Sequence, residues 1–376
     1  MKQIKIIILI GCFMFVLTGC WDEREIGEVN YATTLGIDYK DEYYLLYVQT
    51  LDFSGVAKQE AGKLAEPSPL YIGKGKGRNI NDAIYDLYRT SQQVINWAHV
   101  GAIVYSGSVL ERGIDEVNQA LKKNGEFRYT PWVFGTKDPI EEVLSIIGFF
   151  QMPPIYTILY KPTEAYNIYS FIRPLKMYHF SALFSEPGST VLLPSLSIDD
   201  TKWIESKNKP TPKKTLKING VFPISDKESK EWLPYDELSG IRWMEAKTKN
   251  TPIDLIKDGK IIGLVHVTKP SAKISVIREK DDFQFKFHVK AKGELDSLEE
   301  HLSNDQIEII VRKQIESEIK ETYLNGLEKG IDVLNFRNKI FHKHVKPSQL
   351  NDIQLTADSL REVSVDFKLK NRGVYD

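Results

Sequence analysis

The fold of the last third of the chain is decided by the stretch Phe283-Gln284-Phe285-Lys286-Phe287-His288-Val289-Lys290-Ala291. Apolar and polar residues alternate along it, which is the period of two typical of a strand with one buried face. Two further strand-like runs, Ile261–Val267 and Ala272–Arg278, come directly before it, and Val363–Leu369 comes near the end of the chain. We therefore predict an antiparallel sheet whose last strand is Val363–Leu369.

A long helix is predicted between these strands. Ser303-Asn304-Asp305-Gln306 has the capping-box pattern that begins many helices. Apolar residues then recur at helical spacing at Ile307, Ile310, Val311, Ile315, Ile319 and Tyr323. We expect this apolar side to lie across one face of the sheet, so that residues 258–376 form a C-terminal sheet-plus-helix domain.

The first half of the chain alternates strands with helices. Strands are predicted at Tyr43–Leu51, Gly101–Tyr105 and Tyr129–Gly135, and helices from about Asn81, over Val109–Lys122 and from Asp138 to Ile147. The order βαβαβα predicts a mixed-sheet α/β domain within residues 20–204. Gly73, Gly75 and Gly77 alternate with lysine and arginine, and we interpret them as a flexible turn before the first helix.

A small middle unit is expected between these two domains. Residues 205–215 are polar, contain prolines and lysines, and are typical of a linker. A strand at Lys217–Pro223 and a short helix at Leu233–Met244 follow, so residues 216–252 predict a small α+β middle domain. Because some forty residues make a thin core, we expect this unit to recruit another segment, with residues 22–38 as the candidate. The predicted fold class is α+β with three domains.

The first twenty residues have the features of a lipoprotein signal peptide. Lys2 and Lys5 precede an apolar run from Ile6 to Leu17, which is too short for an ordinary membrane-spanning helix. Leu17-Thr18-Gly19-Cys20 resembles the bacterial lipobox, in which the cysteine thiol receives a diacylglycerol and becomes the first residue. We predict cleavage after residue 19 and lipidation of Cys20. The alternatives are a plain secretory signal and an uncleaved N-terminal anchor; Cys12 ends a second, poorer lipobox.

Composition restricts the partners and the chemistry of the mature protein. Without Lys2 and Lys5, the 50 Lys and Arg fall to 48 against 51 Asp and Glu, which gives no reason to expect a nucleic-acid partner. The chain has 2 cysteines, Cys12 in the signal and Cys20 at the lipidation site. The mature protein is therefore expected to have no disulfide, no thiolate metal site and no cysteine nucleophile.

The sequence contains no catalytic or metal-binding motif that we recognise. It lacks His-Glu-x-x-His, Gly-x-Ser-x-Gly and a phosphate-binding loop. His342 and His344 have no third ligand at helical spacing, and the acidic pairs Glu141-Glu142 and Glu299-Glu300 are expected on solvated surfaces. We predict no catalytic residue, no metal and no cofactor.

Several segments resemble the C-subunit lipoproteins of bacterial spore germinant receptors, the Ger(x)C family. The resemblance is most specific at Gly19-Cys20-Trp21-Asp22, Arg24-Glu25-Ile26 and Gly36-Ile37-Asp38. Weaker similarity occurs at residues 77–84 and 219–222. The chain departs from the family pattern at residues 333–336, where the family's glycines are missing, and around residues 221–232, which are more polar.

The resemblance implies a three-domain α+β lipoprotein without enzymatic activity on the outer face of the spore's inner membrane. It also implies two membrane partners, an A subunit and a B subunit, that sense nutrient germinants with it. Trp21, Asp22, Arg24 and Glu25 lie within about 20 Å of the lipid even when extended, so they are candidates for a contact with a membrane partner; the alternative is a simple spacer. The rival functions are a solute-binding lipoprotein of a transporter and a lipid-anchored cell-wall hydrolase.

Overall fold

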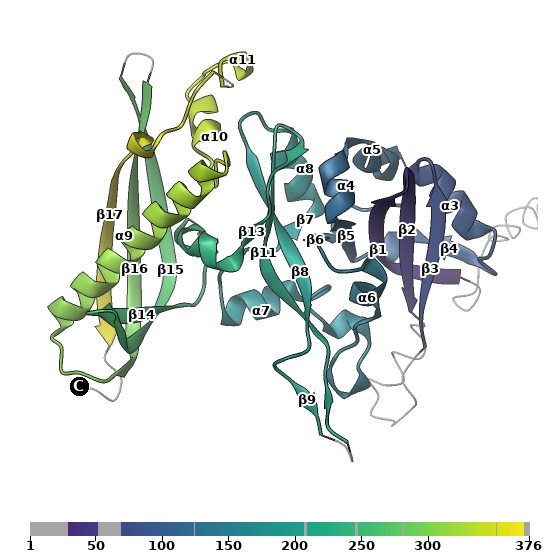
Figure 1. Ribbon diagram of the computed structural model, residues 1–376, viewed down its shortest axis with the longest axis horizontal. Helices are drawn as coiled ribbons and strands as arrows, with labels where there is room; N and C mark the ends of the chain where they lie inside the picture. The colour runs from purple at the N-terminus through teal and green to yellow at the C-terminus, as the bar shows by residue number, and fades with distance from the viewer. Residues whose placement is uncertain are drawn as a thin grey trace, which may run out of the picture.

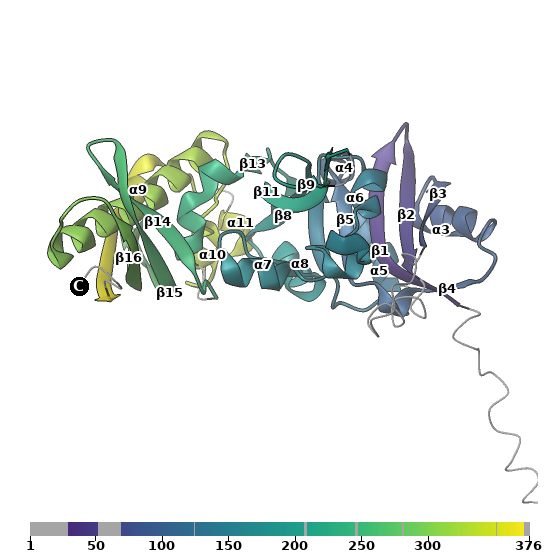
Figure 2. The same ribbon diagram turned by 90° about the horizontal axis from the view of Figure 1, so that it is seen from below.

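The computed structural model describes residues 29–51, 69–123, 125–206, 209–244, 247–279, 282–350 and 352–371. In these residues two main sheets lie toward opposite ends of an elongated molecule (Figures 1 and 2). A 3-10 helix, η5 (Tyr235–Trp243), lies in the chain between the strands of the two sheets. The predicted α+β class is confirmed.

The N-terminal sheet is mixed. Its four central strands, β1 (Val29–Lys40), β5 (Ala102–Ser106), β6 (Trp132–Thr136) and β8 (Thr190–Asp199), are mutually parallel neighbours in the order β1-β5-β6-β8. On one side β2 (Tyr43–Leu51) and β3 (Leu70–Gly77) continue the sheet antiparallel, and on the other side β11 (Thr215–Ser225) and β12 (Glu228–Ser229) do the same. Short strands pair along its borders: β4 (Val94–Asn96), β7 (Leu175–Lys176) and β13 (Leu233–Pro234).

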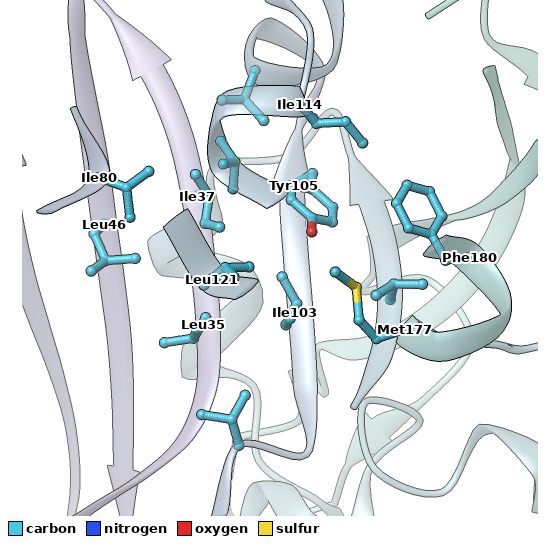
Figure 3. Packing of buried hydrophobic residues seen from close by; sticks show 14 of the residues in the cluster. Leu35, Ile37, Leu46, Ile80, Ile103, Tyr105, Ile114, Leu121, Met177 and Phe180 are labelled. Carbon is cyan, nitrogen blue, oxygen red and sulfur yellow. The ribbon is translucent and has the colours of Figure 1, made fainter. Parts of the chain in front are cut away.

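Apolar side chains alternate between the two faces of this sheet. Ile103 and Tyr105 of β5 belong to the core under α3 (Ile80–Tyr88), α4 (Gly107–Arg112), α5 (Asp115–Lys123) and α8 (Met177–Ser185) (Figure 3). Ala102 and Val104, their neighbours in β5, pack with α6 (Ile140–Ser145) on the opposite face. The helix predicted over Val109–Lys122 is two helices, because Gly113 takes a φ of 101° and ends α4.

The alternating glycines before α3 lie in a strand, and the interpretation as a flexible turn is wrong. Gly75 is in β3, which pairs with β2 along its whole length. A Cβ atom on Gly75 would come within 2.0 Å of the carbonyl oxygen of Ala83 in α3. Glycine is therefore required here because the helix lies directly on the strand.

The region after the central strands also differs from the prediction. Strand β11 pairs with β8 from Thr215 opposite Asp199 to Ser225 opposite Thr190. The described part of residues 205–215 continues this hairpin outward as β9 (Ile204–Glu205) and β10 (Thr211–Pro212), which protrude from the molecule in Figure 1. This segment therefore extends the β8–β11 hairpin as a small two-stranded sheet, and it is not a linker between the two main sheets.

The thin middle unit does recruit another segment, but that segment is β8. Residues 29–38, the part of the candidate segment that the structure describes, lie in β1 between β2 and β5. Two strands joined by a hairpin pair more readily than two strands nearly two hundred residues apart, because less chain entropy is lost. The domain limits 20–204, 216–252 and 258–376 stay a prediction.

The C-terminal sheet has the order β14-β15-β16-β17. β14 (Thr251–Lys257), β15 (Lys260–Glu279) and β16 (Asp282–Leu298) are antiparallel, whereas β17 (Leu360–Asn371) runs parallel to β16. The two strands predicted at 261–267 and 272–278 form one strand, β15, with a shift of register between Thr268 and Ser271. Lys269 has a φ of 47° and Pro270 lacks an N–H, which fits a bulge in a continuous strand.

The parallel direction of β17 follows from α9 (Asn304–Glu328). This helix is about 37 Å long at 1.5 Å per residue and carries the chain back across the sheet (Figure 1). The chain then passes through α10 (Phe336–Phe341), α11 (Pro347–Leu350) and η6 (Ala357–Ser359), and β17 begins opposite Phe285, near the start of β16. The predicted capping box at Ser303 and Gln306 is present. The predicted apolar side is buried at Ile307, Val311, Ile315, Ile319 and Tyr323.

Candidate functional site

The predicted anchor and contact residues lie outside the residues that the structure describes. These are Cys20, Trp21, Asp22, Arg24 and Glu25. The described chain begins at Val29, which pairs with Val94 of β4. In Figure 2, β4 lies at the end of the molecule opposite the C-terminal sheet. The lipidation and the contact therefore stay predictions.

His99 before β5 and His342, one of the two histidines named in the sequence, have ordinary structural surroundings. Nδ1 of His99 lies 3.4 Å from Oδ1 of Asn96, and its ring packs edge-on against Tyr31. Nε2 of His342 lies 3.0 Å from Oε1 of Glu186. In the described part of the chain no three His, Cys, Asp or Glu side chains are grouped so that they could hold a metal ion.

Arg242 and Glu318 form a buried ion pair where η5 meets α9. Arg242 donates from Nη2 to Oε1 of Glu318 at 2.6 Å and from Nε to Oε2 at 3.1 Å. Nε1 of Trp243 donates to the same Oε2 at 2.8 Å, and Nη1 of Arg242 donates to the carbonyl oxygen of Pro252 at 2.8 Å. Burial raises the pKa of Glu318, and the bonds from Arg242 and Trp243 oppose this rise. The cluster ties η5 to both α9 and β14.

Further contacts join the two halves of the molecule beside this ion pair. The rings of Phe171 and Tyr235 stack with their centroids 3.8 Å apart. Asn335 exchanges two hydrogen bonds with the backbone of Thr190, accepting from its N–H at 2.7 Å and donating to its carbonyl oxygen at 3.0 Å. The apolar cluster at this place takes buried residues from both halves, including Ile331 and Val333 after α9. We call this region the junction.

A pocket of about 340 Å³ opens beside the junction. It lies between α7 (Pro162–Ile168), α8, the segment before β14, and the bulge in β15. The pocket contains one arginine and four lysines, namely Arg173, Lys176, Lys247, Lys249 and Lys269, and no Asp or Glu is among its described lining residues. We call it the basic pocket.

Aromatic rings form part of the wall of the basic pocket. Trp132, Tyr166 and Tyr178 line it together with His179. Nζ of Lys176 lies 3.6 Å from the ring centroid of Trp132, a cation–π contact. Burial lowers the pKa of Lys176. This arrangement of cations and rings suits an anionic group attached to an apolar or planar body.

The basic pocket is not predicted by any pattern in the sequence. Its four lysines come from three separate regions of the chain, and Lys247 and Lys249 lie in a polar run near the end of the predicted middle domain. The abundance of lysine in that run was the one local signal. Such a run is commonly a solvated surface, so it does not by itself predict a pocket.

A second feature is an exposed aromatic patch. The ring centroid of Phe149 in η3 (Phe149–Gln151) lies 5.0 Å from that of Trp203 and 6.5 Å from that of Phe150. Phe150 is 96% exposed, and Ile204 beside Trp203 is also exposed. Contiguous exposed apolar side chains are typical of interaction surfaces.

The fold and these sites define an elongated α+β protein with two unlike sheets joined through a buried junction. Residues 22–198 match the family model described as the spore germination protein N-terminal domain, and residues 219–373 match the model described as spore germination B3/GerAC like, C-terminal. The chain belongs to the Ger(x)C family of spore germination proteins. The family predicted from the resemblance is thereby confirmed.

Similarity to individual spore germination proteins agrees with this assignment to the family. The chain is 25% identical to spore germination protein KC of Bacillus subtilis (strain 168) over 389 residues, covering 98% of this chain and 94% of that protein. It is 24% identical to spore germination protein A3 of the same organism, over 78% of this chain and 74% of that protein. The crystal structure of the GerBC protein has the same fold, with a TM-score of 0.51 and 16% identity over 90% of this chain and 96% of that chain.

In the described residues no helix combines the length and the apolar character needed to cross a bilayer.

Proposed function

We propose that this chain is a lipid-anchored, non-enzymatic subunit of a spore nutrient-germinant receptor. It is held by a lipid on Cys20 at the outer face of the spore's inner membrane and supports nutrient-triggered germination together with A and B membrane subunits. The observation that carries the proposal is the match of the two germination-protein models to residues 22–198 and 219–373. Nearly all of the folded chain is thus accounted for by this one family.

The short tether supports a position close to the membrane. Residues 21–28 separate Cys20 from Val29, the first residue of β1. Extended, this segment spans at most about 30 Å. Trp21, Asp22, Arg24 and Glu25 are the residues nearest the headgroups in this arrangement, and a Trp beside charged residues suits a contact at the membrane interface. We propose that these four side chains contact a membrane-embedded partner.

The alternative of a solute-binding lipoprotein of a transporter has less support. Such a protein is expected to close two similar α/β lobes around a cleft. Here the N-terminal sheet is mixed and carries helices on both faces, whereas the C-terminal sheet has four strands and one long helix across it. The dissimilar halves and their buried junction favour a fixed subunit of a complex over a closing clamp.

The anchor is tested by Cys20→Ala in the organism that makes the spores. We expect the variant protein to lack lipid, to leave the membrane fraction and to lower the rate of nutrient-triggered germination. Cys12→Ala is the matched control, because Cys12 ends the poorer lipobox, and it should retain lipidation and germination. A Cys20→Ala protein that still carries lipid and still partitions with membranes would contradict the assignment.

The contact is tested by replacing residues 21–25 with a Gly/Ser segment while keeping Cys20. We expect normal lipidation but weaker co-purification of the membrane subunits and slower germination. If co-purification and germination are both unchanged, residues 21–25 act only as a tether and the partner contact lies on the folded part.

A further inference from the structure

The lysines of the basic pocket have no anionic partner in the described protein. Neither Lys176, Lys247, Lys249 nor Lys269 forms an ion pair with a described Asp or Glu. Elsewhere in the molecule exposed lysines do find carboxylates, as Lys257 does with Glu300 at 2.6 Å and Lys286 does with Glu362 at 2.6 Å. Among the described residues, these four lysines therefore bring together positive charge that no described carboxylate offsets.

Like charges gathered in a recess raise the free energy of the free protein unless an anion offsets them. A concave site with low-dielectric walls focuses the field of its charges, so an anion inside it is attracted more strongly than on an open surface. The ring of Trp132 beneath Lys176 holds that ammonium group at the wall of the pocket. A negative group that enters the pocket favours the charged form of Lys176 and so opposes the lowering of its pKa by burial.

The fold also gives the pocket a defined shape. Lys269 projects from the bulge of β15, where its positive φ turns the strand, whereas Lys176 stands directly before α8. Lys247 and Lys249 flank Thr248, which is buried and donates to the carbonyl oxygen of Arg242 at 2.9 Å. Ser170 accepts from the N–H of Lys249 at 3.1 Å. Lys247 and Lys249 thus lie on backbone that is hydrogen-bonded beside the junction, whereas Lys176 lies in β7 and Lys269 in β15.

We propose that the basic pocket binds the phosphate or carboxylate group of a small organic anion whose apolar part lies against Trp132 and Tyr178. A volume of about 340 Å³ suits a molecule of the size of a lipid headgroup or a small aromatic acid. The anion has two sources: the headgroup of an anionic phospholipid, or a free solute. Figure 2 shows α7, α8 and β4 along the same side of the molecule, and β4 is paired with the first residues of β1. The lipid source rests on the proposed lipid anchor, whereas the free-solute source does not.

The test is chemical footprinting of lysines in the full chain, purified in a neutral detergent. Limited acetylation followed by mass spectrometry measures the reactivity of each lysine with and without a probe. The probes are inorganic phosphate, dihexanoyl phosphatidylglycerol below its critical micelle concentration, and dihexanoyl phosphatidylcholine as the zwitterionic match. We expect an anionic probe to protect Lys176, Lys247, Lys249 and Lys269 but not Lys122 and Lys123, which are exposed at the end of α5.

Paired variants make the test specific to the site. Lys247→Gln with Lys249→Gln should raise the probe concentration needed to protect Lys176 at least about tenfold, since each lysine near an anionic headgroup contributes about 1 kcal/mol. Lys122→Gln with Lys123→Gln removes the same charge elsewhere and should leave that concentration unchanged. All four changed side chains are exposed, so both variants are expected to fold.

Each outcome either supports or overturns the proposal, and two of them distinguish the sources of the anion. Protection by phosphatidylglycerol but not by phosphate supports a lipid headgroup, and protection by phosphate supports a free anion. Equal protection of the pocket lysines and of Lys122 and Lys123, or no protection by either anionic probe, overturns the proposal. These readouts do not use germination or membrane retention, so they can fail while the proposed receptor function stands, and the reverse also holds.

Discussion

At the scale of single residues, Asp199 shows how a carboxylate at the end of a strand stabilises the turn that follows. Its Oδ2 accepts from Nζ of Lys217 at 2.5 Å, and its Oδ1 accepts from the N–H and the hydroxyl of Thr201 at 2.9 and 3.0 Å. The hydrogen bond from Lys217, helped by those from Thr201, holds the pKa of Asp199 well below its usual range. The residue therefore links the start of the protruding hairpin to β11.

This depressed pKa predicts a pH dependence of stability. A carboxyl whose pKa is lower in the folded state contributes stability above its unfolded pKa of about 3.9 and loses it as the pH falls through the folded pKa. Asp199→Asn should lower the free energy of unfolding at pH 7, and its deficit relative to the wild type should shrink below about pH 4. Urea unfolding between pH 3 and pH 7 measures this, with Asp200→Asn as the control. A deficit that is independent of pH would contradict the role of the charge.

At the scale of elements, α9 organises the C-terminal half. Its 25 residues cover one face of the sheet, and Ile307, Val311, Ile315 and Ile319 are all 0% exposed. The same helix carries Glu318, which holds η5, and Thr322, whose hydroxyl oxygen accepts from the N–H of Gly240 at 2.8 Å. The buried residues of α9 thus pack in the core beneath the C-terminal sheet, and the same helix contributes Glu318 and Thr322 to the junction.

A charge placed in the buried side of α9 should unfold this half. Ile315→Asp would bury a carboxylate without a partner and should cost several kcal/mol of stability, about 4 or more. Ile309→Asp on the same helix is the matched control, because Ile309 is 46% exposed, and it should cost under about 1 kcal/mol. Thermal unfolding followed by circular dichroism measures both. Equal melting temperatures for the two variants would show that the buried side of α9 is not core.

At the scale of the whole molecule, the junction fixes the two sheets relative to each other. Arg242 connects η5 to α9 through Glu318 and to β14 through the carbonyl oxygen of Pro252, and Phe171 stacks on Tyr235 beside them. Two hydrogen bonds between Asn335 and the backbone of Thr190 add to the junction. A buried and hydrogen-bonded junction of this kind favours one rigid body, because separation would break these hydrogen bonds and expose the apolar cluster of the junction to water.

Removing one partner of the buried ion pair should therefore affect both halves. Arg242→Met leaves the Glu318 carboxylate buried without its partner and should cost about 3–5 kcal/mol at pH 7. Adding Glu318→Gln to Arg242→Met should recover part of the loss, because the uncompensated charge is gone. Arg361→Met breaks an exposed pair with Glu279 and should cost under about 1 kcal/mol. Calorimetry measures all three, and a loss in Arg242→Met no larger than in Arg361→Met would contradict the role of the junction.

What the sequence by itself determined is local. The alternation in Phe283–Ala291 and the helical spacing from Ile307 to Tyr323 predicted β16 and the buried side of α9, because period and burial are properties of one element. The lipobox at Leu17–Cys20 and the pattern up to Asp38 predicted the family by resemblance. The predicted contact residues lie at positions 21–25, outside the described residues, so that part of the candidate site is a sequence prediction alone.

Only the tertiary structure decided which elements are neighbours. Strand β8 pairs with β11, β17 runs parallel to β16, and residues 261–278 form one strand across the bulge at Lys269. The basic pocket gathers Lys176, Lys247, Lys249 and Lys269 from distant parts of the chain. Strand order, strand direction and a cluster of charges depend on contacts between residues far apart in sequence. No local period encodes such contacts, because they contribute free energy only after elements distant in sequence have packed together.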